Sequence, residues 1–292
     1  MKEIAIIGST ASGKTGLSLD IAQKTNSIIL SLDSLSVYKE IDIASAKPTK
    51  EERGDILHFG IDEVYPDEEF DVIQFIDCYK NAKEHAIKNN NNLIIVGGTG
   101  FYLKALVEGL SKGVDSKIKL DIPVSEAYDL LYSIDKEYMN KIEKNDRYRI
   151  EKAYAIYKQS NKSPSQYFND NPKIPIAKDL QIFEILWDRE ELRRRISLRT
   201  KIMMNDGIID EVISLEKKYS RSPNAMASIG IVETLDFLDG KLNKNELQEK
   251  IALNTAKLAK RQNTFNKGQF TKNKSSNIIT NLNSEIIKFF KL

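Results

Sequence analysis

The stretch EIAIIGSTASGKTGL, residues 3–17, decides the fold. Its apolar first part predicts a buried strand, and Leu17 opens a pattern typical of a helix. Between them lie a glycine, four residues and Gly-Lys-Thr, the pattern of a phosphate-binding loop when it joins a strand to a helix. This loop consists of Gly8, Ser9, Thr10, Ala11, Ser12, Gly13, Lys14 and Thr15. Its backbone N–H groups, the helix dipole and the Lys14 charge predict a cradle for a di- or triphosphate, with Thr15 as a ligand of Mg²⁺.

Apolar strands alternate with helical patterns along the chain. We predict strands at residues 4–7, 28–32 and 93–96, a weaker one at 57–61, and a return to the same sheet at 180–187. This alternation predicts an α/β fold like that of P-loop NTPases, with a parallel sheet flanked by helices. After residue 187 we expect helices at 189–205, 208–219, 228–238 and 244–263, a short strand near 277–280 and a tail helix.

One segment interrupts the α/β pattern. Residues 113–175 are polar and helical in pattern, and Pro164, Pro172 and Pro175 mark a turn-rich exit from them. We therefore expect a small helical subdomain at 113–175, inserted into a core made of residues 1–112 and 176–292.

Composition excludes several classes of protein. The chain has 292 residues, 41% of them hydrophobic and 29% charged, which favours a folded protein with a sizeable core. Cys78 is the one cysteine, and His58 and His85 lack zinc-site spacing, so an internal disulfide and a structural metal are excluded. No apolar run approaches the ~20 residues that span a bilayer, and no signal-peptide core is present. We expect a cytoplasmic protein that makes no membrane contact and acts as a monomer.

The charge is distributed unevenly. Residues 1–110 carry 11 Lys and Arg against 17 Asp and Glu, a net charge of −6, whereas residues 111–292 carry 33 against 25, a net charge of +8. A basic second half suggests that a polyanion such as nucleic acid lies against it. A lysine-rich solvated surface is the alternative interpretation of the same pattern.

Three segments are expected to meet at the carboxyl ends of the strands, where sheets of this type bind ligands. They are the phosphate loop, the segment that begins with Asp33, and Gly97-Gly98-Thr99-Gly100. Asp33 directly follows an apolar strand and is a candidate base, or else it caps the next helix. The glycines let a ligand approach the backbone beside the Thr99 hydroxyl, or else they form an ordinary strand-to-helix turn.

An arginine cluster opens the helix after Trp187. Helical spacing places Arg195 and Arg199 on one face of that helix. Two neighbouring arginines suit a developing phosphate or diphosphate charge. The alternative is a solvated helix with Glu–Arg pairs.

Together these residues resemble the tRNA dimethylallyltransferases, which prenylate adenosine in tRNA. The most specific matches are residues 43–48, which end in Ala-Lys-Pro, and residues 260–265, which read Lys-Arg-Gln-Asn-Thr-Phe. The other matches, in the family's order, are the phosphate loop, Asp33-Ser34 with Tyr38, the glycine turn with Tyr102, Asn145-Asp146 with Arg149, and the Arg195/Arg199 helix. They span nearly the whole chain.

The resemblance implies a reaction. A dimethylallyl group would pass from dimethylallyl diphosphate to N6 of adenosine 37, next to the tRNA anticodon, with the phosphate loop holding the diphosphate. Asp33 would accept the N6 proton or hydrogen-bond that amine. The residues Thr99, Lys14 and Arg195 or Arg199, with Mg²⁺, would stabilise the leaving charge. The adenosine would have to flip out of the stacked anticodon arm.

The resemblance also implies the residues that contact the anticodon stem-loop. They are Asp33, Ser34, Leu35, Ser36, Tyr102, Arg147, Tyr148, Arg149, Lys152, Lys260, Arg261, Gln262 and Phe265. The chain departs from the family pattern at Ser36, where glutamine is usual, and at Phe265, where tryptophan is usual. Its insertion is also shorter, so we expect a reduced domain for clasping tRNA.

Two rival hypotheses fit some of the same residues. In a small-molecule or nucleoside kinase, Lys14, Thr15, Asp33 and the arginine helix would serve phosphoryl transfer from a bound nucleotide such as ATP. In a non-catalytic tRNA-binding protein, the phosphate loop would be a relic, and replacing Asp33 would leave tRNA affinity unchanged.

Overall fold

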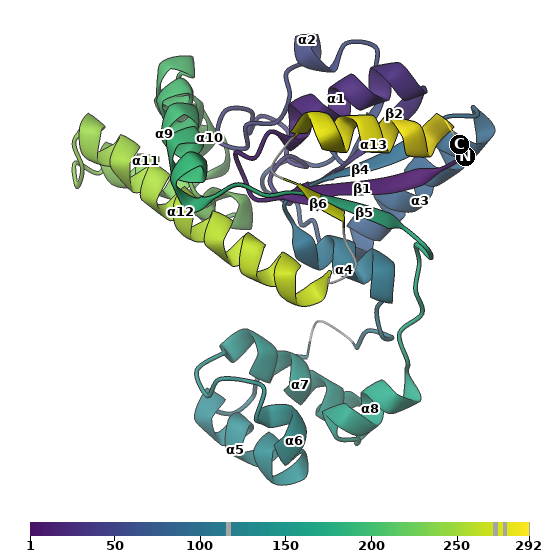
Figure 1. Cartoon of the computed structure of the whole chain (residues 1–292). Helices are drawn as coiled ribbons and strands as arrows, with labels where there is room; N and C mark the ends of the chain where they lie inside the picture. Colours follow the sequence, from purple (N-terminus) through teal and green to yellow (C-terminus); the bar gives the residue numbers. More distant parts are fainter. Residues whose placement is uncertain (115–117, 271–273, 277–278, 292) are drawn as a thin grey trace. The chain divides into compact units, whose positions relative to one another are not determined.

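The computed structural model describes residues 1–114, 118–270, 274–276 and 279–291. The chain divides into two compact units, each described separately below (Figure 1). The first consists of Met1–Lys104 and Asp179–Leu292, and the second is Ala105–Lys178. The inserted unit is thus several residues longer at each end than the segment expected from the sequence.

The first unit contains a parallel sheet of six strands in the order β3-β2-β4-β1-β5-β6 (Figure 1). The strands are β1 (Glu3–Gly8), β2 (Ser27–Leu32), β3 (His58–Phe59), β4 (Asn92–Gly97), β5 (Gln181–Ile185) and β6 (Lys274–Ser276). β1, β2 and β4 are buried along nearly their whole length, because helices cover both faces of a parallel sheet. The predicted α/β class is confirmed, as are the five predicted strands up to residue 187.

The last predicted strand is misplaced. We expected it near residues 277–280, whereas β6 is Lys274–Ser276 and α13 (Ile279–Lys291) begins at Ile279. Residues 277 and 278 lie outside the described residues. The prediction failed because Ile279 opens an apolar stripe whose Leu282 and Ile286 pack against the sheet, and apolar residues that recur at every third or fourth position indicate a helix.

Helices cover both faces of the sheet. α1 (Lys14–Thr25) and α13 lie together on one face, where they bury Ile4, Ile94 and Phe183 (Figure 1). α3 (Val72–Lys88) packs against β2, β3 and β4, and its Phe75 stacks on Tyr102 of α4 (Gly100–Glu108) at 4.7 Å between ring centroids. The short helix α2 (Lys50–Arg53) follows the Ala-Lys-Pro segment.

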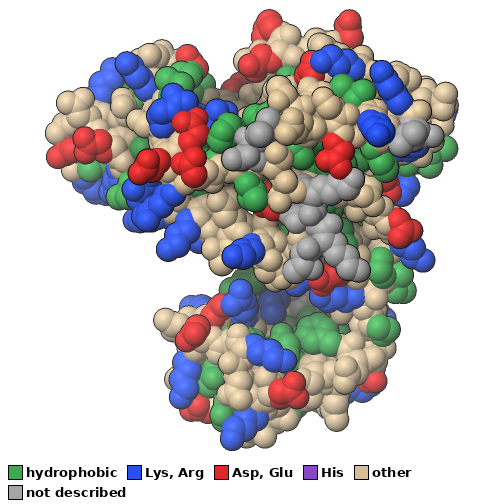
Figure 2. All heavy atoms as spheres, viewed as in Figure 1, with side chains coloured by type: hydrophobic (Ala, Val, Ile, Leu, Met, Phe, Trp, Pro, Cys, Tyr) green, Lys and Arg blue, Asp and Glu red, His purple; other side chains and the backbone are tan. Residues whose placement is uncertain are grey.

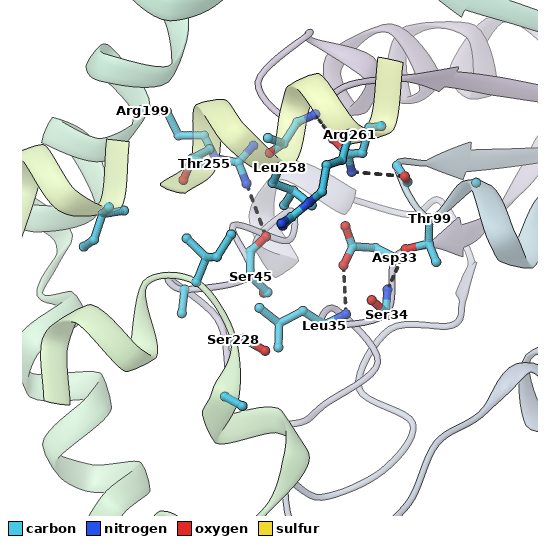
Figure 3. A pocket seen from close by; sticks show the side chains of 18 of the residues that line it. Asp33, Ser34, Leu35, Ser45, Thr99, Arg199, Ser228, Thr255, Leu258 and Arg261 are labelled. Atoms are coloured by element: carbon cyan, nitrogen blue, oxygen red, sulfur yellow. Dashed lines mark hydrogen bonds between the residues drawn. The ribbon is translucent and has the colours of Figure 1, made fainter. Parts of the chain in front are cut away.

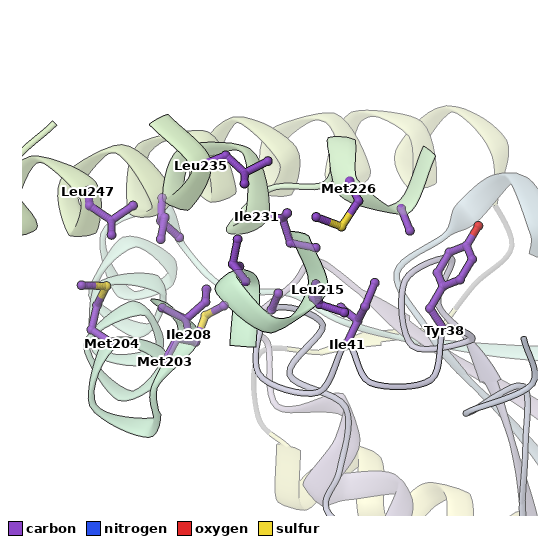
Figure 4. Packing of buried hydrophobic residues seen from close by; sticks show 14 of the residues in the cluster. Tyr38, Ile41, Met203, Met204, Ile208, Leu215, Met226, Ile231, Leu235 and Leu247 are labelled. Carbon is purple, nitrogen blue, oxygen red and sulfur yellow. The ribbon is translucent and has the colours of Figure 1, made fainter. Parts of the chain in front are cut away.

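The C-terminal helices form a second core with the loop that follows β2. They are α9 (Arg189–Asp206), α10 (Ile208–Tyr219), a 3₁₀ turn (Asn224–Ala227), α11 (Ile231–Leu238) and α12 (Lys244–Gln269). α9 and α10 fit the predicted ranges, α11 begins three residues later than expected, and α12 runs six residues further. Met203, Ile208, Ile231 and Leu247 belong to one buried cluster that also contains Ile41 of the loop (Figure 4). This loop, which leads from Asp33 to Pro48, is therefore fixed by packing.

The inserted unit has its own small core. Its helices are α5 (Val124–Ile134), α6 (Lys136–Met139), α7 (Arg147–Ser160) and α8 (Pro164–Asp170). Buried side chains such as Leu131, Met139 and Ile150 hold them together. The predicted helical character is confirmed. No helix in the described part of the chain is long and apolar enough to cross a membrane.

Truncating Leu247 to Ala should lower the free energy of unfolding by about 3 kcal/mol, because it leaves a cavity in the core that holds the loop after β2. Leu253 lies on the same helix with 57% of its surface exposed, and Leu253→Ala should change stability by less than about 0.5 kcal/mol. Urea unfolding of both variants measures the two values. Similar losses for both would contradict the burial of Leu247.

Candidate active site

The phosphate loop is held from outside by three side chains. Gly13 has a φ of 93°, and Ala11 has a φ of 62°, so the loop takes a left-handed turn in two places. Residues 10–12 bond through their backbone to the second half of the chain. Gln262 accepts from the N–H of Thr10 at 2.8 Å, Arg195 donates to the carbonyl of Ala11 at 2.8 Å, and Trp187 donates to the carbonyl of Ser12 at 2.9 Å. The loop is thus shaped before any ligand binds.

Lys14 lies inside the loop. Its Nζ donates to the carbonyl of Ser9 at 2.7 Å. Burial, together with the nearby Arg199, lowers the pKa of Lys14 to about 7, whereas Asp33 acts in the opposite direction. A bound phosphate would place negative charge beside this ammonium and favour its protonated form.

Asp33 follows β2 at the carboxyl end of the sheet. Its Oδ1 accepts from the N–H of Leu35 at 2.9 Å and of Ser36 at 3.2 Å, and these bonds fix the carboxylate in a tight turn (Figure 3). The hydroxyl of Thr99, from the glycine turn after β4, accepts from the N–H of Ser34 at 3.2 Å. The structure therefore brings Asp33 and Thr99 together, as the sequence predicted.

The structure separates the two arginines of α9. Arg199 lines the site and donates to the carbonyl of Ser45 at 3.3 Å, and burial lowers its pKa (Figure 3). Arg195 instead stacks on Trp187, with 4.7 Å from its guanidinium carbon to the ring centroid, and braces Ala11. Arg199 is thus the arginine at the site, and Arg195 supports the loop.

Two cavities meet at these residues. The smaller, of about 80 Å³, is polar and reaches Lys14, Thr15 and Ser36. The larger, of about 520 Å³, has walls of mixed character and reaches α12 (Figure 3). Both cavities are lined by Thr10, Asp33, Ser45, Gly98, Arg199 and Gln262. The carboxylate and the guanidinium therefore stand at the junction of a phosphate-sized space and a wider one.

Several lining residues carried no signal in the sequence. Leu35 was predicted, but the larger cavity is also lined by Met203, Thr255 and Leu258. These come from α9 and α12, whose packing brings them together only in the folded chain. Leu258 and Thr255 lie across the cavity from Leu35 and Ser34 (Figure 3). Single apolar positions on helices cannot be told from core positions by pattern alone.

Two residues predicted to contact tRNA lie deeper than a surface contact requires. Tyr102 is 7% exposed and stacks on Phe75, and burial raises its pKa to about 12. Ser36 is 5% exposed and lines the smaller cavity. Ser34 and Leu35, in contrast, line the larger cavity.

The Ala-Lys-Pro segment is structural. The buried Nζ of Lys47 donates to the carbonyl of Tyr38 at 2.9 Å and lies 2.7 Å from Asp42 and 2.5 Å from Asp62. One lysine thus ties two points of the loop after β2, Tyr38 and Asp42, to Asp62, which follows β3.

Glu211 of α10 is a functional support that the sequence analysis missed. Its carboxylate accepts from the N–H groups of Asp42, Ile43 and Ala44 at 2.7–2.9 Å. Burial raises the pKa of this carboxyl, while the three donors act in the opposite direction. Glu211 therefore fixes residues 42–44, and the next residue, Ser45, accepts the hydrogen bond from Arg199.

The side chains of the Lys-Arg-Gln segment of α12 point in different directions. Lys260 and Arg261 are exposed, and Figure 2 shows Lys and Arg side chains gathered along α12. Arg261 and Phe265 also line the larger cavity. Gln262 turns inward and joins Thr10 to Gly98, with its amide nitrogen 3.0 Å from the Gly98 carbonyl oxygen.

The predicted RNA contacts of the insertion all lie at the start of α7. Arg147 and Arg149 are exposed, and Tyr148 keeps 70% of its surface exposed. The Nζ of Lys152 lies 5.6 Å from the centre of the Tyr148 ring, and Arg149 pairs with Asp146 at 3.1 Å. The structure thus groups these four residues on one exposed helix end.

The site offers few side chains that could bind a metal ion. The described residues contain no group of three or more His, Cys, Asp or Glu side chains that could hold an ion. Thr15, in the first turn of α1, lines the smaller cavity beside Lys14. Mg²⁺ commonly takes one or two protein ligands together with phosphate oxygens and water, so a single hydroxyl at a phosphate site fits this ion.

Comparison with known proteins identifies the family. The model of the IPP transferase family matches residues 36–269 of this chain. The chain belongs to this family. It is similar to the tRNA dimethylallyltransferase of Aliarcobacter butzleri (strain RM4018), with 73% identity over 292 residues and 100% of each chain covered. It is also similar to the tRNA dimethylallyltransferase of Campylobacter concisus (strain 13826), with 50% identity over 290 residues and 99% of each chain covered.

Solved structures of the IPP transferase family have the same fold. The tRNA isopentenylpyrophosphate transferase of Staphylococcus epidermidis has a TM-score of 0.73 and 28% identity, with 100% of this chain and 99% of that chain covered. A eukaryotic dimethylallyltransferase acting on tRNA has a TM-score of 0.79 and 28% identity, with 91% of this chain and 70% of that chain covered. The family predicted from the motifs is confirmed.

Replacing Lys14 with Met should remove a pH dependence of stability. The folded pKa of about 7 lies below the ordinary value of 10.5, so the unfolded chain binds more protons between these pH values. Stability contributed by Lys14 therefore rises with pH across this window, by at most about 1.4 kcal/mol per pH unit. The free energy of unfolding of Lys14→Met should exceed that of the native chain most at pH 7, and this difference should shrink towards pH 10.

Urea unfolding at each pH measures this difference. Lys24→Met, at an exposed lysine of α1, is the matched control and should run parallel to the native chain. A difference for Lys14→Met that stays constant with pH would contradict the burial of the ammonium.

Proposed function

We propose that this chain transfers a dimethylallyl group from dimethylallyl diphosphate to N6 of the adenosine at position 37 of tRNA, releasing diphosphate. The observation that carries the proposal is the junction of two cavities at Asp33 and Arg199. A diphosphate fits the polar cavity beside Lys14, and an adenine with a five-carbon chain fits the wider one. The relatives' names support the same reaction.

The reaction proceeds at the junction of the cavities. The N6 amine attacks the allylic carbon, a nitrogen–carbon bond forms, and the bond from that carbon to the diphosphate oxygen breaks. The N6 proton passes to the Asp33 carboxylate, which lines both cavities and is held in place by the turn after β2. Lys14 and Arg199 receive the charge that builds on the leaving diphosphate, and the Thr99 hydroxyl orients it.

Magnesium suits the same site. Thr15 would hold Mg²⁺ together with diphosphate oxygens, and the ion would supply further positive charge to the leaving group. Lys14 holds its own charge once the diphosphate is present, because the anion raises its lowered pKa. The loop residues bind and orient the substrate in either case.

Transfer RNA would contact each of the two units through basic residues. In the first unit these are Lys260 and Arg261 on α12, beside the larger cavity. In the inserted unit they are Arg147, Arg149 and Lys152, with Tyr148 exposed among them. Contacts of this kind hold the phosphate backbone of the anticodon arm while adenosine 37 flips into the cavity. We further propose that the protein acts as a monomer in the cytoplasm.

Replacing Asp33 with Asn should lower the transfer rate by about 100-fold or more while leaving tRNA affinity within about twofold, because a proton acceptor is lost and the shape is kept. The assay incubates the protein with Mg²⁺, radiolabelled dimethylallyl diphosphate and unmodified tRNA, and locates the label in the nucleoside. Asp67→Asn, at an exposed carboxylate, is the control. A preserved rate in Asp33→Asn would refute the role of Asp33.

The same assay tests the function itself. Native protein that binds tRNA without labelling adenosine 37 would refute the proposed transfer. Turnover of ATP to ADP would then identify a kinase, and its absence would leave a tRNA-binding protein.

Replacing both Lys260 and Arg261 with Ala should weaken tRNA binding and reduce the slope of log K against log salt by about 1.5, because two phosphate contacts are lost. The slope is measured by fluorescence anisotropy between low and moderate salt. Lys24→Ala with Lys80→Ala, two exposed lysines on α1 and α3, is the control pair. An unchanged slope would remove Lys260 and Arg261 from the RNA interface.

A further inference from the structure

Gln262 connects two loops that the chain places 88 residues apart, since Thr10 and Gly98 are its partners. Its amide oxygen accepts from the Thr10 N–H at 2.8 Å, and its amide nitrogen donates to the Gly98 carbonyl at 3.0 Å. The phosphate loop and the turn after β4 are thus bridged by one side chain from α12. An amide suits this task because it offers a donor and an acceptor on one rigid plane.

The space around the Gln262 amide is shaped for it. A Cβ on Gly98 would lie 2.4 Å from Nε2 of Gln262, so the glycine is required for the glutamine to reach its place. Thr10, Gly98 and Gln262 all line both cavities. The bridge therefore stands at the junction where the reaction takes place.

α12 carries both the bridge and the basic surface. Lys260 and Arg261 directly precede Gln262 on the same continuous helix, which runs from Lys244 to Gln269. A helix transmits a shift of a few tenths of an ångström along its axis, because its backbone bonds resist local distortion. RNA that binds Lys260 and Arg261 would thus change the position of the Thr10 peptide through Gln262.

We propose that Gln262 is a positioning residue that couples RNA binding on α12 to the geometry of the diphosphate site. It acts by fixing the Thr10 peptide against Gly98, and its amide is committed to these two backbone groups. The expected effect of Gln262 on the rate of transfer rests on the proposed function. The coupling between the two binding sites can be measured with an RNA and a diphosphate alone.

The test compares the native full chain with Gln262→Met, which keeps an unbranched side chain of similar length and loses both hydrogen bonds. Calorimetry measures the Kd of inorganic diphosphate with Mg²⁺, with and without a saturating anticodon stem-loop RNA. Anisotropy measures the Kd of the RNA alone. Gln248→Met, on the same helix and away from the bridge, is the matched control.

We expect the RNA to tighten diphosphate binding at least fivefold in the native chain and in Gln248→Met. In Gln262→Met this coupling should fall below twofold, and diphosphate should bind about tenfold more weakly. The RNA Kd measured alone should stay within twofold. In the transfer assay kcat should fall at least tenfold with an unchanged KM for RNA, a split that a general loss of stability would not produce.

A second variant keeps the test decisive if Gln262→Met does not fold. Gln262→Glu retains the acceptor for the Thr10 N–H and loses the donor to Gly98, so hydrogen exchange at the Thr10 amide should stay slow while the coupling is lost. A weakened RNA Kd with intact diphosphate binding, in either variant, would overturn the proposal and assign Gln262 to the RNA. Native-like coupling in either variant, or no coupling in the native chain, would overturn it as well.

The two proposals fail separately. If the native chain shows the coupling but transfers no dimethylallyl group, the proposed function falls and the positioning role stands. If the native chain transfers the group and Gln262→Met does so at the same kcat, only the positioning role falls.

Discussion

The site depends on the backbone of three residues being held from outside. Thr10, Ala11 and Ser12 are fixed by side chains from the second half of the chain, two of which come from α9 and α12. A phosphate loop free in solution would have to order its N–H groups at the moment of binding, and that ordering opposes affinity. Here the ordering is completed when the protein folds. This explains why a loop that begins at residue 8 needs side chains from residues 187–262, far away in the sequence, to hold its shape.

A second set of contacts holds the loop after β2, which forms another wall of the two cavities. Glu211 binds the backbone of residues 42–44, and Lys47 ties that segment to Tyr38 and Asp62. Both charges are largely buried, and each is satisfied by several partners, which is the condition under which buried charge is tolerated. The apolar cluster beneath fixes the same loop through Ile41 and Ala44. Arg199 meets the carbonyl of Ser45, and the nearby Asp33 carboxylate partly offsets the cost of burying its charge.

Much of this could be predicted from the sequence, and the reason lies in local patterns. The strand–loop–helix at residues 3–17 and the apolar runs after it define the sheet, because a buried parallel strand must be apolar on both faces. Asp33 and Thr99 were predictable because the carboxyl ends of parallel strands meet at one edge. Arg199 could not be told from Arg195 by helical spacing, since only the packing of α9 and α12 decides which one reaches the cavity. Glu211 and Gln262 act through backbone groups far away in sequence, and no spacing rule indicates such partners.

The two ends of the insertion are fastened to each other. The carbonyl of Leu106 accepts from the N–H groups of both Ile176 and Ala177, and Gly109 passes so close to Ile174 that a Cβ would lie 2.0 Å from its carbonyl oxygen. The chain that enters the insertion is therefore closed against the chain that leaves it. Closing a longer loop costs only slightly more entropy than closing a shorter one. Because the two ends are closed in this way, a change in the length of the insertion need not shift the register of the strands that lead to Asp33 and Thr99.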